Sequence, residues 1–142
     1  MKLVLTIAVA ILVSLAGTCN ASPSVFVYIN LSSQTMTVES VEPAAFYEWK
    51  VSTGRRGYRT PAGTFKPQLL SRMHYSSRYE SAPMPYSIFF SGNYAIHGTY
   101  EVKNLGRPVS HGCVRLAPEN AKTLFNMVKQ AGKANVRIRI VR

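Results

Sequence analysis

Short runs of β-branched and aromatic residues, separated by turn-forming residues, recur along most of this chain and constrain its fold. Residues 25–29 form a near-continuous apolar run that is typical of a buried strand. Residues 35–38 and 135–141 alternate between apolar and polar, and Val136, Ile138 and Ile140 fall on one face of the last run. Because many short strands need a second layer to bury their apolar faces, the pattern predicts a β-sandwich or barrel.

Three further strands and one helix complete this prediction. The strands are expected over residues 46–51, 86–90 and 94–97, with Phe46, Trp49 and Val51 packing in the core. The helix is expected to begin at Pro118 and to end at Gly132. Its apolar residues recur at helical spacing and are Ala121, Leu124, Phe125 and Val128. The chain is therefore predicted to be mainly β with one helix.

Two segments are predicted to lack regular structure. Residues 60–65 contain Pro61, which presets φ, and Gly63, which tolerates positive φ, and so they predict a turn. Residues 71–85 carry His74, two tyrosines and two prolines, and they predict a long loop. A loop of that length in a small domain is often a binding element, so His74 is a weak site candidate.

The first 21 residues are predicted to be a secretory signal peptide. Lys2 precedes an apolar run over residues 3–16, and cleavage is expected after Ala21. An uncleaved anchor is the alternative, but the run is shorter than the roughly 20 residues of a spanning helix. A lipoprotein signal ending at Cys19 is a second alternative. Residues 22–142 are long enough for one compact domain.

The charge of the chain is strongly positive, with 17 Lys and Arg against 6 acidic residues, all of them Glu. This balance favours anionic partners through long-range attraction, with simple solubility as the alternative explanation. Export argues against nucleic acid as a partner. A carboxylate- or phosphate-rich polymer of a bacterial envelope fits the predicted compartment better.

Cys113, in the string Ser110-His111-Gly112-Cys113, is the main candidate for chemistry. It would be the only cysteine left after signal removal, so it has no partner for an intramolecular disulfide. A thiol near its reference pKa is mostly protonated at neutral pH, and a nucleophilic cysteine therefore needs a base or a cation nearby. The thiol is predicted to be reactive, with an inert core cysteine as the alternative.

His97 and His111 are the candidate bases. His111 would lie on the same side as Cys113 if that segment were extended, and His97 ends an apolar strand that can hold it rigidly. Gly98 and Gly112 permit close backbone approach, and amides around Gly112 and Cys113 are candidates for an oxyanion site. Since the chain has no Asp, a Glu or a backbone carbonyl must fix the tautomer of the basic histidine, and a carbonyl near Gly98 is expected to do so.

Zinc bound by His97, His111 and Cys113 is an alternative, but the paired ligand spacing of strong zinc sites is missing. No metal and no cofactor are expected. The Gly-rich setting could also be simple turn chemistry. A papain-like peptidase is disfavoured because both histidines precede the cysteine.

Two motifs in order give the chain a specific resemblance. The first is Ile96-His97-Gly98-Thr99, and the second is Ser110-His111-Gly112-Cys113-Val114-Arg115-Leu116, with twelve residues between His97 and Ser110. Together with the upstream segments 51–54 and 60–65, they resemble the L,D-transpeptidase (YkuD) family over roughly residues 25–141. The resemblance implies a mixed-sheet β fold and cysteine acyl transfer on peptidoglycan.

The resemblance also implies roles for single residues. Cys113 matches the family nucleophile and His97 its general base, while His111 and Gly112 match positions that shape the pocket and oxyanion site. Contacts to substrate are expected from Gly98, Thr99, Ser110 and Arg115. The basic residues Arg55, Arg56 and Arg59 are further candidates for holding a stem peptide, with solvated surface as the alternative.

The implied reaction starts with attack of Cys113 on the third residue of a peptidoglycan stem and release of D-alanine. An amine acceptor then gives a 3→3 crosslink or attaches a wall-anchored protein. Alternatives are an L,D-carboxypeptidase or amidase using the same acyl-enzyme, and a non-catalytic wall-binding module. The resemblance suggests a carbapenem as an acylating probe. The expected compartment is a periplasm, with a cell wall or extracellular location as the alternative.

Overall fold

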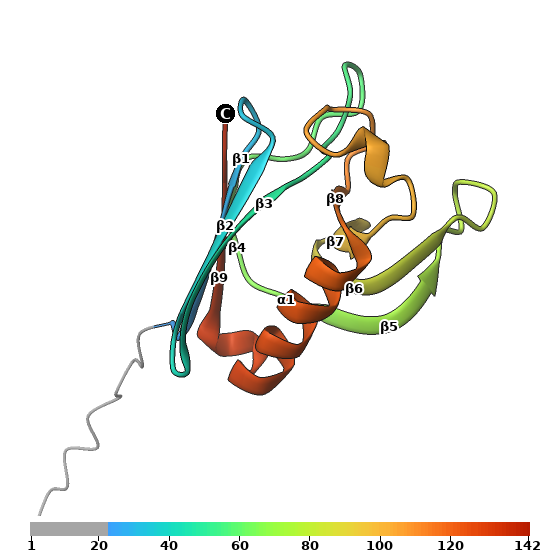
Figure 1. The fold of residues 1–142 in the computed structure, drawn as a ribbon. Helices are drawn as coiled ribbons and strands as arrows, with labels where there is room; N and C mark the ends of the chain where they lie inside the picture. The colour runs from blue at the N-terminus through green and yellow to red at the C-terminus, as the bar shows by residue number, and fades with distance from the viewer. Residues whose placement is uncertain (1–22) are drawn as a thin grey trace, which may run out of the picture.

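The computed structural model describes residues 23–142, so the predicted signal peptide and its alternatives lie outside the described residues. Two β-sheets face each other, and one α-helix lies across the space between them (Figure 1). No helix in residues 23–142 has the length and apolar character needed to cross a membrane. The prediction of a mainly β fold with one helix is confirmed.

The first sheet has five strands in the order β3-β2-β1-β9-β4. Strands β1 and β9 are parallel, and the other neighbours are antiparallel, so the sheet is mixed. Its inner face carries the alternate apolar residues predicted from the sequence, and Val136, Ile138 and Ile140 are buried. The strands are β1 (Val25–Asn30), β2 (Thr35–Val41), β3 (Ala44–Lys50), β4 (Gly63–Phe65) and β9 (Val136–Val141).

The second sheet has four strands in the order β5-β6-β7-β8 and carries the candidate site. Strands β7 and β8 are parallel, and the connection between them contains the short 3-10 helix η1 (Val102–Asn104). The strands are β5 (Leu69–Tyr75), β6 (Pro83–Ser91), β7 (Tyr94–Gly98) and β8 (Val114–Leu116).

The helix α1 (Pro118–Ala131) packs mainly on β6 and β7 and also reaches β1. It has Pro118 in its first turn and ends before Gly132. Gly132 has a φ of 83°, which is unfavourable for residues with a side chain. The four apolar residues predicted from the spacing are its buried residues. A second 3-10 helix, η2 (Lys133–Asn135), joins α1 to β9.

The prediction of a long loop over residues 71–85 is wrong, because most of this segment belongs to the hairpin of β5 and β6. Only residues 76–82 connect the two strands, and Tyr75 pairs with Pro83. The prolines that suggested a loop lie where β6 has β5 as its only paired neighbour, since the pairing with β7 begins at Ile88. A strand tolerates proline where one side makes no ladder hydrogen bonds.

Two smaller predictions also need correction. Gly63 has positive φ (146°) as expected, but residues 63–65 form β4 on the edge of the first sheet and are not part of a turn. Phe46 is 62% exposed, whereas Trp49 packs against the core and Val51 is fully buried. Because Phe46 and Trp49 are three residues apart in one strand, they point to opposite faces.

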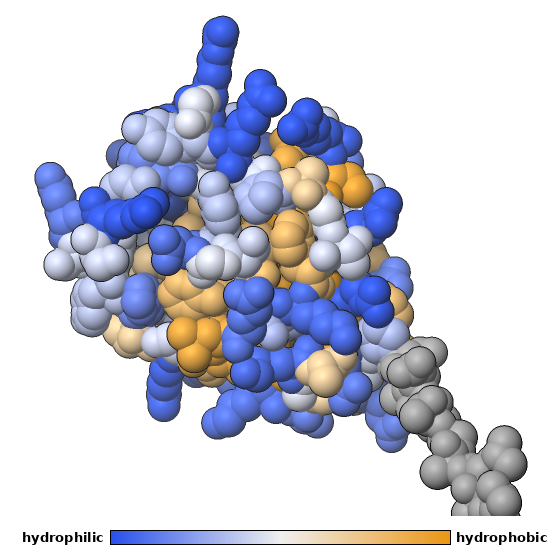
Figure 2. All heavy atoms as spheres, turned by 180° about the vertical axis from the view of Figure 1, so that it is seen from behind, coloured by the Kyte–Doolittle hydropathy of each residue, from blue (hydrophilic) through white to orange (hydrophobic). Residues whose placement is uncertain are grey.

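Viewed from behind, the molecule has hydrophilic side chains projecting around most of its outline (Figure 2). Hydrophobic residues reach the surface between them.

Candidate functional site

Cys113 lies one residue before β8, beside the strand that carries His97. In the parallel pairing of β7 and β8, Ile96 lies opposite Val114 and His97 lies opposite Arg115. One step back along both strands brings Cys113 level with Ala95, whose backbone amide interacts with the thiol. Since residues two apart on a strand share a face, His97, Cys113 and Arg115 come together on one face of the sheet.

The thiol of Cys113 is half-buried, and burial raises its pKa. The amide of Ala95 and the guanidinium of Arg115 act in the opposite direction, because both favour the thiolate. Cys113 Sγ donates a hydrogen bond to the carbonyl oxygen of Asn93, at 3.7 Å. The resting form of Cys113 is therefore the thiol.

His97 is buried at the end of β7, and its tautomer is set by the backbone. Its Nδ1 lies 2.6 Å from the carbonyl oxygen of Gly98. Because a carbonyl only accepts hydrogen bonds, Nδ1 carries the proton and Nε2 keeps its lone pair. The prediction that a carbonyl near Gly98 orients the basic histidine is confirmed.

The pKa of His97 is lowered to about 4, chiefly because burial disfavours the imidazolium. The hydrogen bond to Gly98 acts the other way, and the charges of Arg115 and His74 lower the pKa further. His97 is consequently neutral at physiological pH and can accept a proton. His74 thus lies within electrostatic reach of His97, and its ring meets Phe89 edge-on at 5.0 Å.

His111 has a different environment from His97, at the edge of the site. The backbone bends at Gly112, with φ of 119°, so the extended geometry assumed for His111 and Cys113 does not occur. His111 Nε2 lies 3.1 Å from Arg55 Nη2, and the ring stacks on Tyr79 at 4.1 Å. Because Arg55 can only donate, Nε2 is the acceptor and is not available as a base toward Cys113.

Arg55, Tyr58 and Tyr79 surround His111 and come from two loops that the sequence did not connect with it. The Arg55 guanidinium lies 4.7 Å from the centre of the Tyr58 ring, and that ring meets His111 edge-on at 4.9 Å. Tyr79 belongs to the β5–β6 connection, so the tip of this hairpin packs on His111. Burial and the charges of Arg55 and Arg115 lower the pKa of His111.

Ser110 is fully buried and holds the loop before Cys113 in shape. Its hydroxyl donates to the carbonyl oxygen of Cys113 at 2.6 Å and accepts the amide of Gly112 at 3.0 Å. The side chain of Ser110 has no accessible surface, and its expected contact with substrate stays a prediction. These hydrogen bonds also mean that the amide of Gly112 is already engaged.

The segment after β3 supports the same loop from the other side. The amide of Ser110 donates to the carbonyl oxygen of Thr53, and Gly54 forms a bridge with Ser110. The hydroxyl of Thr60 donates to the carbonyl oxygen of Gly112 at 2.8 Å. These contacts were missed because nothing in a single sequence indicates that residues 53–60 and 110–112 are neighbours.

Of the remaining predicted substrate contacts, Gly98 and Thr99 are buried and Arg115 is partly accessible. A Cβ on Gly98 would lie 3.1 Å from Pro85 and 3.2 Å from Pro118. The amide of Thr99 donates to Leu116. These two residues are closely packed, and their expected contacts with substrate stay predictions. Arg115 forms an ion pair with Glu101, at 3.3 Å.

Arg55, Arg56 and Arg59 are all exposed, but only Arg55 touches the residues of this site. Among the described residues, no group of three or more His, Cys, Asp or Glu is placed to hold a metal ion.

Comparisons with known proteins show the family of this chain and its fold. A model of the YkuD family, the L,D-transpeptidase catalytic domain, matches residues 24–138. The chain is 37% identical over 71 residues to the probable L,D-transpeptidase YbiS of Escherichia coli K12, covering 41% of this chain and 23% of that protein. The matched region therefore makes up less than a quarter of the length of that relative.

Two solved structures share the fold. An L,D-transpeptidase from Mycobacterium smegmatis gives a TM-score of 0.73 at 22% identity, over 84% of this chain and 59% of that one. An L,D-transpeptidase from Stackebrandtia nassauensis gives a TM-score of 0.72 at 27% identity, over 86% of this chain and 57% of that one. Because the family model covers nearly all the described residues, this chain belongs to the L,D-transpeptidase (YkuD) catalytic domain family.

Proposed function

We propose that this protein is a peptidoglycan L,D-transpeptidase in which Cys113 is the nucleophile and His97 the general base. The observation that carries the proposal is the placement of both residues on one face of the β7–β8 pair. There the Gly98 carbonyl leaves His97 Nε2 with its lone pair. A neutral, oriented imidazole beside a thiol is the arrangement that cysteine acyl transfer requires.

In the first half-reaction, Cys113 Sγ attacks the carbonyl carbon of the third stem residue, and the thiol proton passes to His97 Nε2. The tetrahedral intermediate collapses to a thioester as the C–N bond to D-alanine breaks. The imidazolium returns its proton to the departing amine. Because the amide of Gly112 is held by Ser110, we assign the oxyanion contact first to the amide of Cys113.

In the second half-reaction, the side-chain amine of a neighbouring stem attacks the thioester carbon. His97 takes the proton from that amine and returns it to the leaving sulfur, so the thiol is regenerated. The product is a 3→3 crosslink. If the amine belongs to the terminal lysine of a protein, the product is a wall-anchored protein instead.

The charges of the chain suit a substrate whose stem peptides carry several carboxylates. The excess of 17 basic over 6 acidic residues raises the local concentration of such a polymer. Arg55 and Tyr79, which contact His111, are candidates for holding a stem, and the charge of Arg115 acts on both Cys113 and His97. The substrate is extracytoplasmic, so we place the protein in the periplasm after export.

The test is incubation of the purified protein with tetrapeptide muropeptides, followed by mass spectrometry of the products. Crosslinked dimers and free D-alanine are expected from the wild type, and neither is expected from Cys113→Ala. Tripeptide without dimers would show that water is the acceptor, and the protein would then be an L,D-carboxypeptidase.

A second measurement separates an enzyme from a wall-binding module that keeps the fold. A carbapenem should add once to the intact wild-type protein and not to Cys113→Ala. Absence of any adduct on the wild type favours the binding module, and an adduct that survives the substitution refutes the assignment of the nucleophile.

A further inference from the structure

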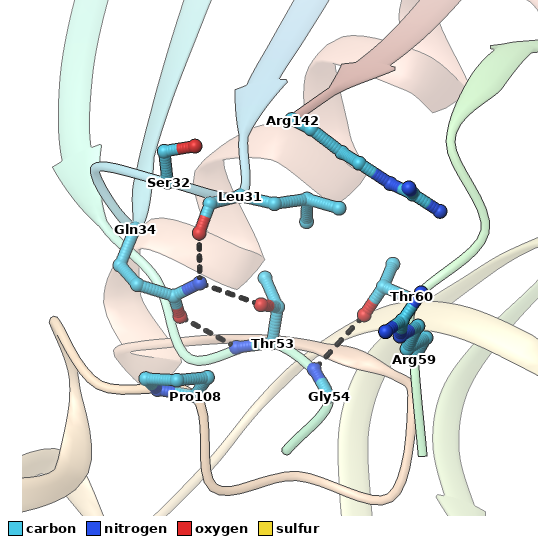
Figure 3. A pocket seen from close by; sticks show the side chains of 9 residues that line it. All are labelled: Leu31, Ser32, Gln34, Thr53, Gly54, Arg59, Thr60, Pro108 and Arg142. Carbon is cyan, nitrogen blue, oxygen red and sulfur yellow. Dashed lines mark hydrogen bonds between the residues drawn. The ribbon is translucent and has the colours of Figure 1, made fainter. Parts of the chain in front are cut away.

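A pocket of about 320 Å³ lies on the other side of the segment that supports the Cys113 loop. It contains none of the residues proposed above for catalysis. Its lining comes from five parts of the chain: the β1–β2 turn, the segment after β3, the loop before β4, the loop before Ser110 and the end of β9 (Figure 3). The lining residues used below are Gln34, Thr53, Gly54, Arg59, Thr60 and Arg142.

Two arginines face this pocket, and no acidic residue lines it. Figure 3 shows the side chains of Arg59 and Arg142 on the side of the pocket where Thr60 lies. Within residues 23–142 the one ion pair joins Arg115 to Glu101, so neither pocket arginine has an acidic partner there. Two guanidinium groups that form no ion pair at one opening are suited to binding an oxyanion.

The polar groups at the base of the pocket are already ordered. Gln34 is 4% exposed, and its amide group bonds to Leu31, to the hydroxyl of Thr53 and to the backbone of Thr53. The hydroxyl of Thr60 accepts the amide of Gly54 at 2.9 Å (Figure 3). A ligand would therefore meet a preformed floor, and only the exposed arginine side chains would have to become ordered.

From these observations we propose that the pocket is a binding site for a small oxyanion, a carboxylate or a phosphate, held by Arg59 and Arg142. A carboxylate would come from a peptide end, and a phosphate from an envelope polymer. The volume is close to the lower end of the roughly 300–1,000 Å³ typical of small-ligand sites. The site does not depend on the role proposed for Cys113.

The floor of this site is bonded directly to the loop that carries Cys113. The carbonyl of Thr53 accepts the amide of Ser110, and the hydroxyl of Thr60 donates to the carbonyl of Gly112. An oxyanion held beside Thr60 is thus one side chain away from the backbone of Gly112. Binding is expected to change the environment of the Ser110 and Gly112 amides as well as that of the pocket residues.

The test is an NMR titration of the 15N-labelled protein with inorganic phosphate and, separately, with acetate, at constant ionic strength set by chloride. We expect saturable shifts of the Thr53 and Gly54 amides with at least one probe, and shifts of the Ser110 and Gly112 amides with the same dissociation constant. The probe that saturates identifies whether a phosphate or a carboxylate is the preferred class.

Arg59→Gln and Arg142→Gln should each weaken binding by about tenfold or more, because each removes a charged donor. Arg56→Gln is the matched control, since Arg56 is an exposed arginine of the same loop that does not line the pocket. Cys113→Ala should bind like the wild type. Non-saturating shifts with both probes, or equal binding by all three arginine variants, would overturn the proposal.

Discussion

The Nδ1 of His97 lies 2.6 Å from the carbonyl oxygen of Gly98, the next residue in the chain. The proton on Nδ1 is thereby fixed by the backbone, and no acidic side chain is needed to orient the imidazole. This solution suits a chain without any Asp. Because the same histidine is buried, its protonation also links activity and stability to pH.

The rate of carbapenem acylation should fall as pH decreases through about 4, the pKa of His97. Above that pH the imidazole is neutral and accepts the thiol proton, so the rate should reach a plateau near neutrality. Stopped-flow or mass-spectrometric rates from pH 3.5 to 8 measure the profile. A half-maximal rate at pH 6.5 would mean that His97 keeps the pKa of an exposed imidazole.

Protein stability should also decrease at acidic pH because of His97. Its pKa is about 4 in the folded protein and 6.5 in the unfolded chain, so below pH 6.5 protons bind preferentially to the unfolded state. The stability is complete above pH 6.5 and falls by about 3 kcal/mol as pH decreases to about 4. Urea unfolding of the wild type and His97→Asn at pH 7 and pH 4.5 measures the effect.

His97→Asn keeps a donor for the Gly98 carbonyl but does not titrate, so its stability should depend less on pH. His74→Gln removes only the smallest of the charge effects on the pKa of His97, so it should keep most of the slope of the wild type. Equal slopes for His97→Asn and the wild type would show that other groups cause the acid sensitivity.

Removing the charge of Arg115 should make Cys113 less acidic. The guanidinium lowers the pKa of the thiol against the larger effect of burial, so Arg115→Gln should raise that pKa further. The pH dependence of iodoacetamide alkylation, with the modified residue confirmed by peptide mapping, measures the shift. Lys103→Gln removes a nearby exposed charge of the β7–β8 connection and should leave the profile unchanged. Identical profiles for Arg115→Gln and the wild type would contradict the prediction.

Ser110→Ala should destabilise the protein by about 1–3 kcal/mol, because it leaves the buried amide of Gly112 without its acceptor. It should also slow acylation by loosening the loop before Cys113. Thr123→Ala removes a similar hydroxyl, bonded to Glu119 on the exposed side of α1, and should change stability by less than about 0.5 kcal/mol. Thermal unfolding compares them, and equal losses would argue against a structural role for Ser110.

Gly112→Ala should cost more stability than Gly57→Ala. Both glycines have positive φ, of 119° and 87°, so both substitutions introduce backbone strain. Only at Gly112 would the new Cβ collide with a neighbour, at 2.6 Å from Tyr94 Cε1, whereas nothing lies within 4 Å at Gly57. Chemical denaturation of the two variants gives the difference, and equal costs would mean that Tyr94 moves aside freely.

The elements with strong local signals could be predicted from the sequence. Pro118 and Gly132 marked the ends of α1, and the alternation of residues 136–140 gave β9 and its buried face. Strands β4 and β8 are only three residues long, so they carry no periodicity of their own. The β5–β6 hairpin was missed because its edge position permits prolines and polar residues that are also typical of loops.

The candidate site was predictable only as far as its motifs extend. Cys113 and His97 lie in short motifs with residue types suited to catalysis. The lack of Asp left a Glu or a backbone carbonyl to orient the histidine, and the carbonyl of Gly98 is the one observed. Tyr79 and Thr60 reach the same site through tertiary packing, which one sequence does not reveal. The assumption of an extended chain at His111 failed because Gly112 bends the backbone.

The parallel register of β7 and β8 has an evolutionary consequence. The pairing of Ile96 with Val114 sets the positions of the His97 imidazole and the Cys113 sulfur relative to each other. The number of residues in the connection between the two strands does not affect these positions. Relatives can therefore lengthen or shorten the connection around η1 without changing how His97 and Cys113 lie relative to each other. Insertions that diversify partner choice should accumulate there, and a one-residue slip of β8 should be far more damaging than a ten-residue insertion.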